Sequence, residues 1–202
     1  MSFETLASEV LFRGRVLTLR RDEVQMSDGV AVREVVEHPG AVAIVALDDD
    51  GRVVLVRQYR HPVGHELDEL PAGLLDVDGE PALVGAQREL HEEAALRADR
   101  WDVLTDFYTS PGMSTEAIRV YLARDLHDVG EHERFDGEHE EATMTVERRP
   151  LDDAVADVFT GRINNGIAVA GLLAAARARD TGFVGLRPAD APWAAKPDRA
   201  GP

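Results

Sequence analysis

The sequence predicts a mixed α/β or α+β fold, and three observations support this class. Two runs rich in valine and isoleucine, AVAIVAL (41–47) and RVVLVRQY (52–59), are typical of buried strands. Residues 81–94 carry apolar side chains at the spacing of one helix face. Further strand-like and helix-like segments follow in mixed order without an internal repeat, which favours α/β or α+β over a helical bundle.

The composition limits the class of protein. A chain of 202 residues with 44% hydrophobic residues suits one well-cored domain. Its formal net charge of −16 disfavours nucleic acid and an anionic membrane surface as partners. There is no cysteine, which fits a reducing cytoplasm, and we find neither an export signal nor an apolar run long enough to span a membrane. We therefore expect a cytoplasmic protein.

The first half of the chain is expected to form strands. Residues 16–24 and 30–36 flank a turn at SDG (27–29) and predict an antiparallel pair. This N-terminal strand unit, residues 1–38, is too small to be stable alone. The runs 41–47 and 52–59 are joined by the turn sequence DDDG and are expected to form the core sheet.

The second half alternates helices and strands. We expect a helix at 81–94, strands at 101–109 and 117–123 on either side of the loop SPGMSTE, and a strand at 143–147. Helices follow at about 151–159 and 167–179, the first of them ended by Gly161. The main domain is thus expected to span residues 39–182. The proline-rich segment 183–202 is expected to be irregular or disordered.

The helix at 81–94 carries an acidic stripe. Glu89, Glu92 and Glu93 fall in one sector of the helix, next to the apolar sector. Like charges so close destabilise a helix unless something compensates them. One interpretation is an ordinary solvated acidic face. The other is a site for a hard divalent cation, Mg²⁺ or Mn²⁺, because these cations prefer oxygen ligands and the chain has no thiolate to offer.

The segment GLLDVDGEPALVGAQRELHEEAAL, residues 73–96, resembles the Nudix box. That pattern reads Gly, five residues, Glu, seven residues, Arg-Glu-apolar, any residue, Glu-Glu, any residue, Gly, apolar. The matching positions are Glu80, Arg88, Glu89, Leu90, Glu92, Glu93 and Leu96. Six residues instead of five separate Gly73 from Glu80, and Ala95 replaces the final glycine, which we expect to be tolerated if its backbone stays right-handed.

The resemblance implies a Nudix fold, a mixed β-sheet between helices, and a cation-dependent hydrolase of nucleoside diphosphate derivatives. By position, Glu89 and Glu93 would be the main metal ligands, with Glu92 an additional one and the carbonyl of Ala72 a further oxygen ligand. Arg88 has two interpretations. It would either contact phosphate or, as we favour, form an orienting salt bridge to a box carboxylate such as Glu80.

Outside the box, four segments resemble the ADP-ribose pyrophosphatase branch of the family: 32–44, 56–60, 69–73 and 110–116. The resemblance implies contacts to substrate from Arg33, Arg60, Glu69, Leu74, Ser110, Pro111, Gly112, Met113 and Glu116. For each of the two arginines, an ordinary salt bridge is the alternative. Asp68 stands where the branch usually has an aromatic residue, so the resemblance does not explain how adenine would be held.

The resemblance also implies a general base and a dimer. The acidic loop GEHEEATM (137–144) would supply the base, for which we favour Glu141 over Glu140 and Glu138. Glu140 would otherwise be a further metal ligand. A homodimer is implied in which the N-terminal strand unit contacts the partner subunit, so that Arg33 could reach the neighbouring active site.

The function expected from these features is hydrolysis of ADP-ribose to AMP and ribose 5-phosphate with Mg²⁺ or Mn²⁺ as cofactor. Two alternatives remain. One is a pyrophosphatase acting on another substrate, such as a sugar nucleotide, NADH or a dinucleoside polyphosphate. The other is a Nudix module that senses a ligand without cleaving it, although such modules commonly lose box carboxylates and carry a DNA-binding extension.

Overall fold

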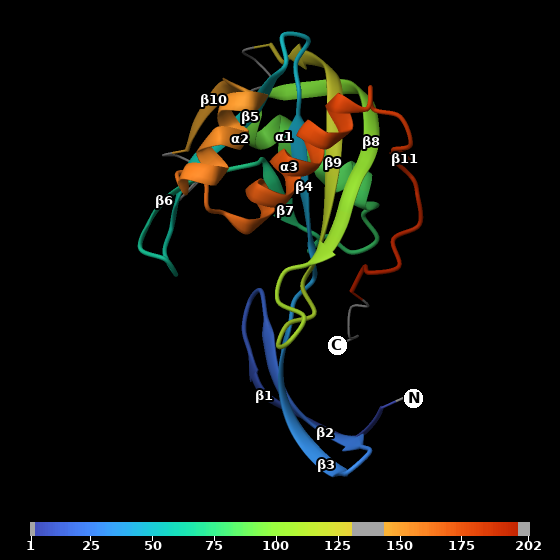
Figure 1. Cartoon of the computed structure of the whole chain (residues 1–202). Coiled ribbons are helices and arrows are strands. Elements are labelled where there is room, and N and C mark those ends of the chain that lie inside the picture. Colours follow the sequence, from blue (N-terminus) through green and yellow to red (C-terminus); the bar gives the residue numbers. More distant parts are fainter. Residues whose placement is uncertain (1–2, 131–143, 198–202) are drawn as a thin grey trace.

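The computed structural model describes residues 3–130 and 144–197 and shows a helix-covered body from which an N-terminal sheet projects (Figure 1). The projecting sheet contains β1 (Glu4–Arg13), β2 (Thr18–Met26) and β3 (Gly29–Glu37), paired antiparallel in that order. The expected antiparallel pair corresponds to β2 and β3. Strand β1 was not predicted from the sequence; its ten residues are all exposed and show no buried face.

The central sheet of the body has the strand order β11-β8-β9-β4-β7. Its members are β4 (Ala41–Ala46), β7 (Ala72–Leu74), β8 (Leu96–Tyr108), β9 (Ala117–Asp128) and β11 (Arg187–Pro188). The sheet is mixed, because β4 pairs with β9 in parallel and with β7 antiparallel. The mixed sheet between helices agrees with the expected fold class.

A second sheet lies beside the first, with the order β10-β5-β6. It consists of β5 (Arg52–Arg60), β6 (His65–Glu69) and β10 (Thr145–Pro150), all paired antiparallel. The expectation that the two valine-rich runs share one core sheet was therefore wrong. The turn between them forms as expected, with Gly51 at a φ of 74°, but β4 and β5 then continue into different sheets.

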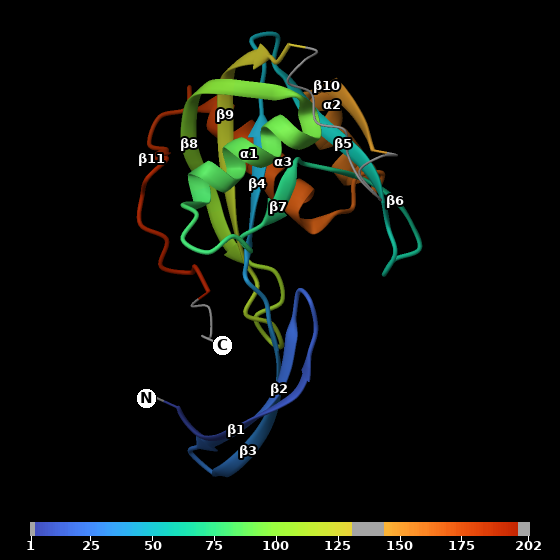
Figure 2. The same cartoon turned by 180° about the vertical axis from the view of Figure 1, so that it is seen from behind.

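Helices cover both faces of the central sheet. Helix α1 (Ala82–Ala94) lies on one face, and α3 (Gly166–Asp180) lies on the other beside α2 (Leu151–Thr160), as Figure 2 shows from behind. Strand β4 is buried along its whole length because its alternate side chains point into the two layers. Val42, Ile44 and Ala46 pack with α1, and Val45 packs with α3.

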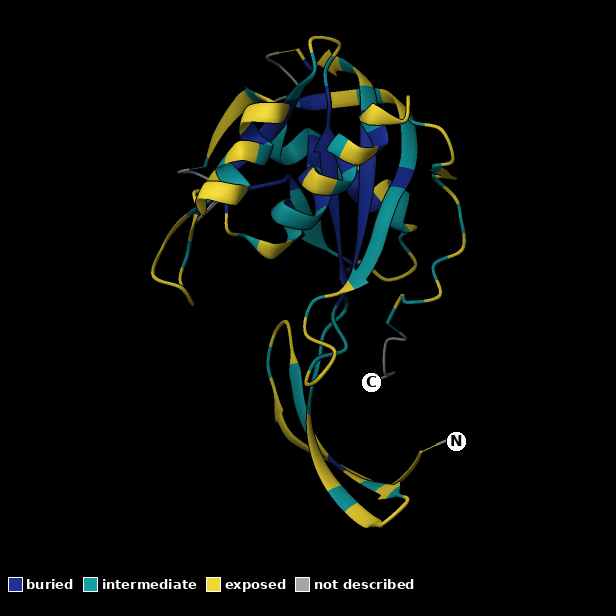
Figure 3. Ribbon diagram, viewed as in Figure 1, coloured by how far each residue is buried: buried dark blue, intermediate teal, exposed yellow. Residues whose placement is uncertain are grey.

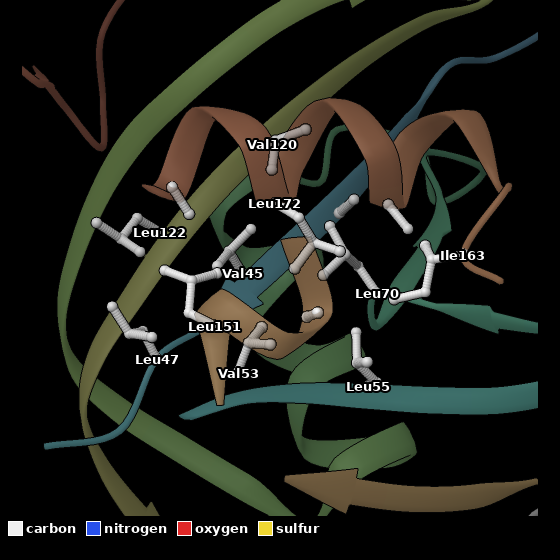
Figure 4. Close-up of a cluster of buried hydrophobic side chains, with 14 of the residues drawn as sticks. Val45, Leu47, Val53, Leu55, Leu70, Val120, Leu122, Leu151, Ile163 and Leu172 are labelled. Atoms are coloured by element: carbon white, nitrogen blue, oxygen red, sulfur yellow. The ribbon is translucent and has the colours of Figure 1, made fainter. Parts of the chain in front are cut away.

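The larger of the two core clusters fills the space between the sheets, α2 and α3 (Figure 4). Leu172 of α3 and Leu151 of α2 meet Val45, Val53 and other buried side chains there, and all four are 0% exposed. The core therefore fixes β4 between the helices and holds β7, which pairs with it, at the edge of the sheet.

The described part of the C-terminal segment, residues 183–197, contains the short strand β11 and is packed against the body. Residues 187 and 188 pair with β8, and the tail then continues along the body. The buried guanidinium of Arg119 donates to the carbonyls of Ala191 and Pro192 at 2.7 and 3.1 Å and lies 4.9 Å from the ring of Trp193. These contacts hold the tail beside β8 and β9.

The N-terminal sheet touches the body through the end of β3. Val36 N–H donates to the Met113 carbonyl at 2.8 Å, and Thr115 N–H donates to the Val36 carbonyl at 3.0 Å. Beyond this contact the sheet is largely exposed, as Figure 3 shows. Among the described residues, none of the helices has the length and apolar character needed to cross a membrane.

Candidate functional site

Strand β7 presents a backbone edge to the first helix. The Ile44 N–H donates to the Pro71 carbonyl at 2.8 Å, so Pro71 faces β4. Successive residues of a strand direct their backbone groups to opposite sides, so Ala72 directs its N–H and carbonyl away from β4. The Ala72 N–H donates to Glu93 Oε2 of α1 at 2.9 Å. One box carboxylate is thus fixed next to the expected carbonyl ligand.

Gly73 makes room for a second carboxylate. A Cβ atom at this position would overlap Cδ and Oε1 of Glu89. The Glu89 side chain, 12% exposed, therefore lies directly on the backbone of β7. Any larger residue would push Glu89 away, which gives a physical reason for glycine at the start of the box motif.

Arg88 lies between the acidic side chains of the box. Its guanidinium is 3.3 Å from Glu80, 2.7 Å from Glu89 and 2.9 Å from Glu92. Burial lowers the pKa of Arg88, but its hydrogen bonds and the nearby negative charges outweigh burial and raise that pKa above its ordinary value. Arg88 therefore stays charged. The ion pair with Glu80 agrees with the orienting role that we favoured from the sequence.

Helix α1 ends at Ala95, the residue that replaces the final glycine of the box motif. Ala95 adopts a left-handed conformation, with φ 52° and ψ 41°, and its N–H is bonded to carbonyls of the last helical turn. The condition under which we expected alanine to be tolerated here, a right-handed backbone, is therefore not met. A left-handed turn is the usual helix terminator, and glycine is the residue that adopts it without strain.

The donor set of the box fits a hard divalent cation. Carboxylates from Glu89 and Glu93 and the outward carbonyl of Ala72 meet where α1 crosses β7, and all of these ligand atoms are oxygen. Within residues 3–130 and 144–197, no three acidic or histidine side chains already surround a common point. Arg88 partly neutralises the acidic face of α1 through its ion pairs with Glu89 and Glu92.

Two of the expected substrate contacts pair with each other. Arg60, at the end of β5, donates from Nε and Nη2 to the carboxylate of Glu69 at 2.6 to 3.2 Å. Glu69 is only 3% exposed, whereas Arg60 is partly exposed. The salt bridge that we considered as the alternative for Arg60 is thus present. It fixes the guanidinium of Arg60 on Glu69, a residue that precedes Ala72 by three positions in the chain.

Asp68 is part of a separate, structural ion-pair cluster. This aspartate is 6% exposed and accepts hydrogen bonds from Arg57 at 3.0 Å and from Arg149 at 3.1 Å. Arg149 also binds Asp157 of α2 at 2.7 Å. The residue that replaces the usual aromatic therefore ties β6 to β5, β10 and α2.

The loop 110–116 forms a compact turn below the central sheet. Ser110 accepts hydrogen bonds from Met113 N–H and Ser114 N–H at 3.0 and 2.9 Å, while Pro111 and Gly112 form its exposed tip. Glu116 accepts a hydrogen bond from Thr109 Oγ1 at 2.5 Å. The expected ribose-pocket residues are therefore near one another, but they lie at the base of the N-terminal sheet.

His38 is a site residue that was not predicted from the sequence. Its Nδ1 accepts a hydrogen bond from Gly40 N–H at 3.2 Å and lies 3.6 Å from Glu116 Oε1. The segment EHPG, directly after β3, was the signal that could have identified it. His38 thus links the end of the N-terminal sheet to the loop that carries Glu116.

The remaining expected residues are spread over other parts of the chain. Arg33 lies on β3 of the projecting sheet, where its side chain is exposed and donates to the Val32 carbonyl at 2.9 Å. Leu74 follows Gly73 on β7 and lines a cavity at the base of the N-terminal sheet. The proposed base residues lie outside the described part of the chain: Glu138, Glu140 and Glu141.

Comparisons with known proteins agree with these features. A family model described as the NUDIX domain matches residues 37–160, and one described as the nucleoside diphosphate sugar hydrolase N-terminal domain matches residues 3–36. The chain is 52% identical over 196 residues to an ADP-ribose pyrophosphatase of Mycobacterium tuberculosis (strain ATCC 25618 / H37Rv), covering 96% of this chain and 93% of the relative.

A second relative and a solved structure extend the comparison. An ADP-ribose pyrophosphatase of Bacillus subtilis (strain 168) is 38% identical over 161 residues, which cover 75% of this chain and 86% of the relative. A crystal structure of an ADP compounds hydrolase superposes with a TM-score of 0.75 at 23% identity, covering 91% of this chain and 98% of that one. The structural likeness shows the shared fold. Because the NUDIX domain model covers more than half of the chain and residues 73–96 carry its box, the chain belongs to the Nudix hydrolase family.

Proposed function

We propose that this protein hydrolyses the pyrophosphate bond of ADP-ribose and releases AMP and ribose 5-phosphate. The observation that carries the proposal is the 52% identity, over 96% of the chain, to a relative described as an ADP-ribose pyrophosphatase. The geometry of the box supports it. Carboxylates from α1 lie against the edge of β7, where a cation could join them to the phosphates of a substrate.

The cofactor in this proposal is Mg²⁺ or Mn²⁺. Glu89, Glu93 and the carbonyl of Ala72 would hold the cation, with Glu92 as an additional ligand. When bound, such a cation neutralises the diphosphate and lowers the pKa of a coordinated water. The task of Arg88 is to keep the carboxylates separated and oriented, since it pairs with Glu89 and Glu92 at 2.7 and 2.9 Å.

The substrate would be held by groups around the box. Arg60 would bind phosphate, and Glu69 would fix its guanidinium plane through their double hydrogen bond. Glu69 and Glu116 would accept hydrogen bonds from the nucleoside. Further contacts would come from Arg33, Leu74, Ser110, Pro111, Gly112 and Met113.

The general base in the proposal is Glu141, with Glu140 as the competing residue and as a further metal ligand. Both lie outside the described residues, so the assignment depends on the sequence alone. Replacing each in turn by Gln separates them: we expect Glu141→Gln to lose most of its turnover and Glu140→Gln to change the cation concentration needed for half-maximal rate. Near-normal turnover of Glu141→Gln would move the role of base elsewhere.

We also propose a homodimer formed through the N-terminal sheet. The sheet exposes apolar side chains to a degree unusual for a free surface, including Phe12 at 59%, Val30 at 57% and Val32 at 55%. A partner subunit that covers them would also explain how so small a sheet remains folded. Analytical ultracentrifugation should give twice the chain mass, and a stable, fully active monomer would exclude this part.

The test of the function is product analysis in ¹⁸O-labelled water. We expect ADP-ribose to give AMP and ribose 5-phosphate in the presence of Mg²⁺, with one ¹⁸O atom per turnover in a product phosphate. Excess chelator should abolish the reaction. Undiminished hydrolysis in chelator would refute the cation site.

A substrate panel distinguishes the alternatives. GDP-mannose, NADH and dinucleoside polyphosphates should be hydrolysed with a lower kcat/KM than ADP-ribose. A higher value for any of them would reassign the substrate. Tight binding of ADP-ribose without cleavage would indicate a ligand-sensing module.

A further inference from the structure

The C-terminal tail, residues 187–197, ends beside the loop that precedes the box helix. We define the box loop as residues 75–80, which join β7 to α1. The tail and the box loop lie side by side (Figure 2) and line the same cavity of about 500 Å³. The tail contributes Trp193, Ala194, Lys196 and Pro197 to this lining, and the box loop contributes Leu75, Val77, Gly79 and Glu80. The tail is therefore a direct neighbour of the box loop.

The box loop is mostly exposed. Residues 76–79 lie at the surface, whereas Leu75 at the start of the loop is buried. The Leu75 N–H donates to the Gly40 carbonyl at 3.0 Å, and the Glu80 N–H donates to the Val77 carbonyl within the loop at 3.3 Å. A segment with so little buried surface opens locally at a low free-energy cost unless a neighbour holds it.

The position of the box loop matters because the loop ends at Glu80. The Glu80 carboxylate accepts hydrogen bonds from Arg88 at 3.3 and 3.4 Å, which are long for such bonds. The carboxylate also lies close to α1, where a Cβ atom on Gly85 would be 2.9 Å from Glu80 Oε2. A small outward shift of the loop would therefore break the bonds to the guanidinium that pairs with Glu89 and Glu92.

Trp193 connects the tail to the core beneath the box. Its indole packs against the buried cluster that contains Leu75 of the box loop and Ala86 and Leu90 of α1. The ring lies 4.9 Å from the guanidinium of Arg119, which is buried and also donates to two carbonyls of the tail. Displacing the tail would remove two hydrogen bonds and a cation–π contact from a buried charge, so the position of the indole is well fixed.

We propose that Trp193 is a positioning residue for the box: it holds the box loop in place, so that Glu80 can orient Arg88. The consequence for catalysis rests on the proposed function, whereas the contact between the tail and the loop does not. The indole acts through its ring, because Nε1 of Trp193 is buried and makes no hydrogen bond within the described part of the chain. A phenyl ring should therefore be able to replace it.

Trp101 provides a matched control, because it is the other tryptophan of the chain. It packs from β8 against the same buried cluster, its ring lies 6.1 Å from that of Tyr121, and its Nε1 donates to the Ala98 carbonyl at 2.9 Å. Trp101 does not line the cavity beside the box loop. Trp101→Ala therefore removes an identical side chain from the same cluster, but at a place away from the loop.

The first measurement is hydrogen exchange of the full chain in excess chelator, resolved to single amides. In Trp193→Ala the Leu75 amide should exchange at least about tenfold faster than in the parent, and in Trp193→Phe within about twofold of the parent rate. Trp101→Ala should leave this amide at the parent rate, because local opening of the loop does not involve the indole on β8. Equal exchange in Trp193→Ala and the parent, or equal acceleration in both alanine variants, would overturn the proposal.

The second measurement is turnover of ADP-ribose at saturating Mg²⁺. The kcat of Trp193→Ala should fall by about tenfold, Trp193→Phe should recover most of it, and Trp101→Ala should stay within about twofold of the parent. A parent-like kcat in Trp193→Ala would refute the positioning role. If the parent itself did not hydrolyse ADP-ribose, the proposed function would fail, and the exchange of the Leu75 amide would still decide whether Trp193 holds the loop. Circular dichroism and the thermal unfolding midpoint verify that each variant is folded.

Discussion

The backbone N–H of Ala72 donates to the carboxylate of Glu93 at 2.9 Å, across 21 positions of the chain. This bond joins the edge of the central sheet to the acidic face of α1. Because the N–H and the carbonyl of one strand residue point to the same side, it also brings the Ala72 carbonyl next to the carboxylate. Two of the expected metal ligands are thus positioned by a single hydrogen bond.

Replacing Glu93 by Gln should separate catalysis from folding. The amide oxygen of Gln can still accept the Ala72 N–H, so the free energy of unfolding should change by less than about 1 kcal/mol. The lost negative charge removes a cation ligand, so turnover of ADP-ribose should fall by about 100-fold or more. Glu66→Gln, on the exposed part of β6, is the control and should keep its rate. A full rate for Glu93→Gln would contradict the metal site.

Adding one methyl group at Gly73 of β7 should displace a second carboxylate of the same site, that of Glu89. The new Cβ would overlap the Glu89 carboxylate, so Gly73→Ala must displace Glu89 or shift β7. We expect at least about a tenfold loss of kcat and a loss of about 1 to 3 kcal/mol in the free energy of unfolding, measured by urea titration.

The control for this prediction is Gly166→Ala at the start of α3. A Cβ there meets no atom within 4 Å, and alanine favours a helix, so activity should be unchanged and stability equal or slightly higher. If both variants behaved alike, the close approach of Glu89 to Gly73 would not matter for function.

Ala95 gives a prediction of increased stability. Its left-handed backbone, with φ 52°, costs an L-residue roughly 1 kcal/mol that glycine does not lose. Ala95→Gly should therefore raise the free energy of unfolding by about that amount. Ala94→Gly, one position earlier in right-handed helix, should lower it by about 0.5 to 1 kcal/mol. If both changes lowered the free energy of unfolding, the backbone of Ala95 would not be left-handed in solution.

The parts of the fold that the sequence predicted are those with local signals. The apolar spacing of residues 81–94 predicted α1 within one residue, because helix periodicity is contained in a single segment. The box carboxylates were identified because their motif also lies within one continuous segment, residues 73–96. Gly161 was identified as the end of α2, and its φ of 77° confirms the left-handed turn.

The parts that the sequence did not predict depend on partners distant in the chain. β4 and β5 have similar composition, but β4 pairs with β9 and β5 with β10, and nothing in either run specifies that choice. Arg60 and Glu69 were each expected to face substrate, whereas the hairpin between β5 and β6 brings them together. β1 lacks a buried face, so no hydrophobic alternation marks it.

The ion pair between buried Arg119 and partly buried Asp106 predicts how stability depends on pH. Burial raises the pKa of Asp106, but hydrogen bonds from Arg119 and Arg187 outweigh burial and hold that pKa below its ordinary value. A carboxyl with a lowered pKa in the folded state stabilises the fold above its unfolded pKa, about 3.9, and loses this contribution as the pH falls through the folded value.

Asp106→Asn should therefore destabilise the chain most at neutral pH. The substitution leaves the guanidinium of Arg119, 3% exposed, without its carboxylate, and the expected loss at pH 7 is about 3 kcal/mol. As the pH falls below about 4, the parent progressively loses the same interaction, so the difference in the free energy of unfolding between the two proteins should shrink. Asp152→Asn removes the carboxylate from an exposed pair with Arg179 and should cost far less at neutral pH. A constant difference between parent and Asp106→Asn from pH 7 to pH 3 would show that the charge of Asp106 does not stabilise the fold.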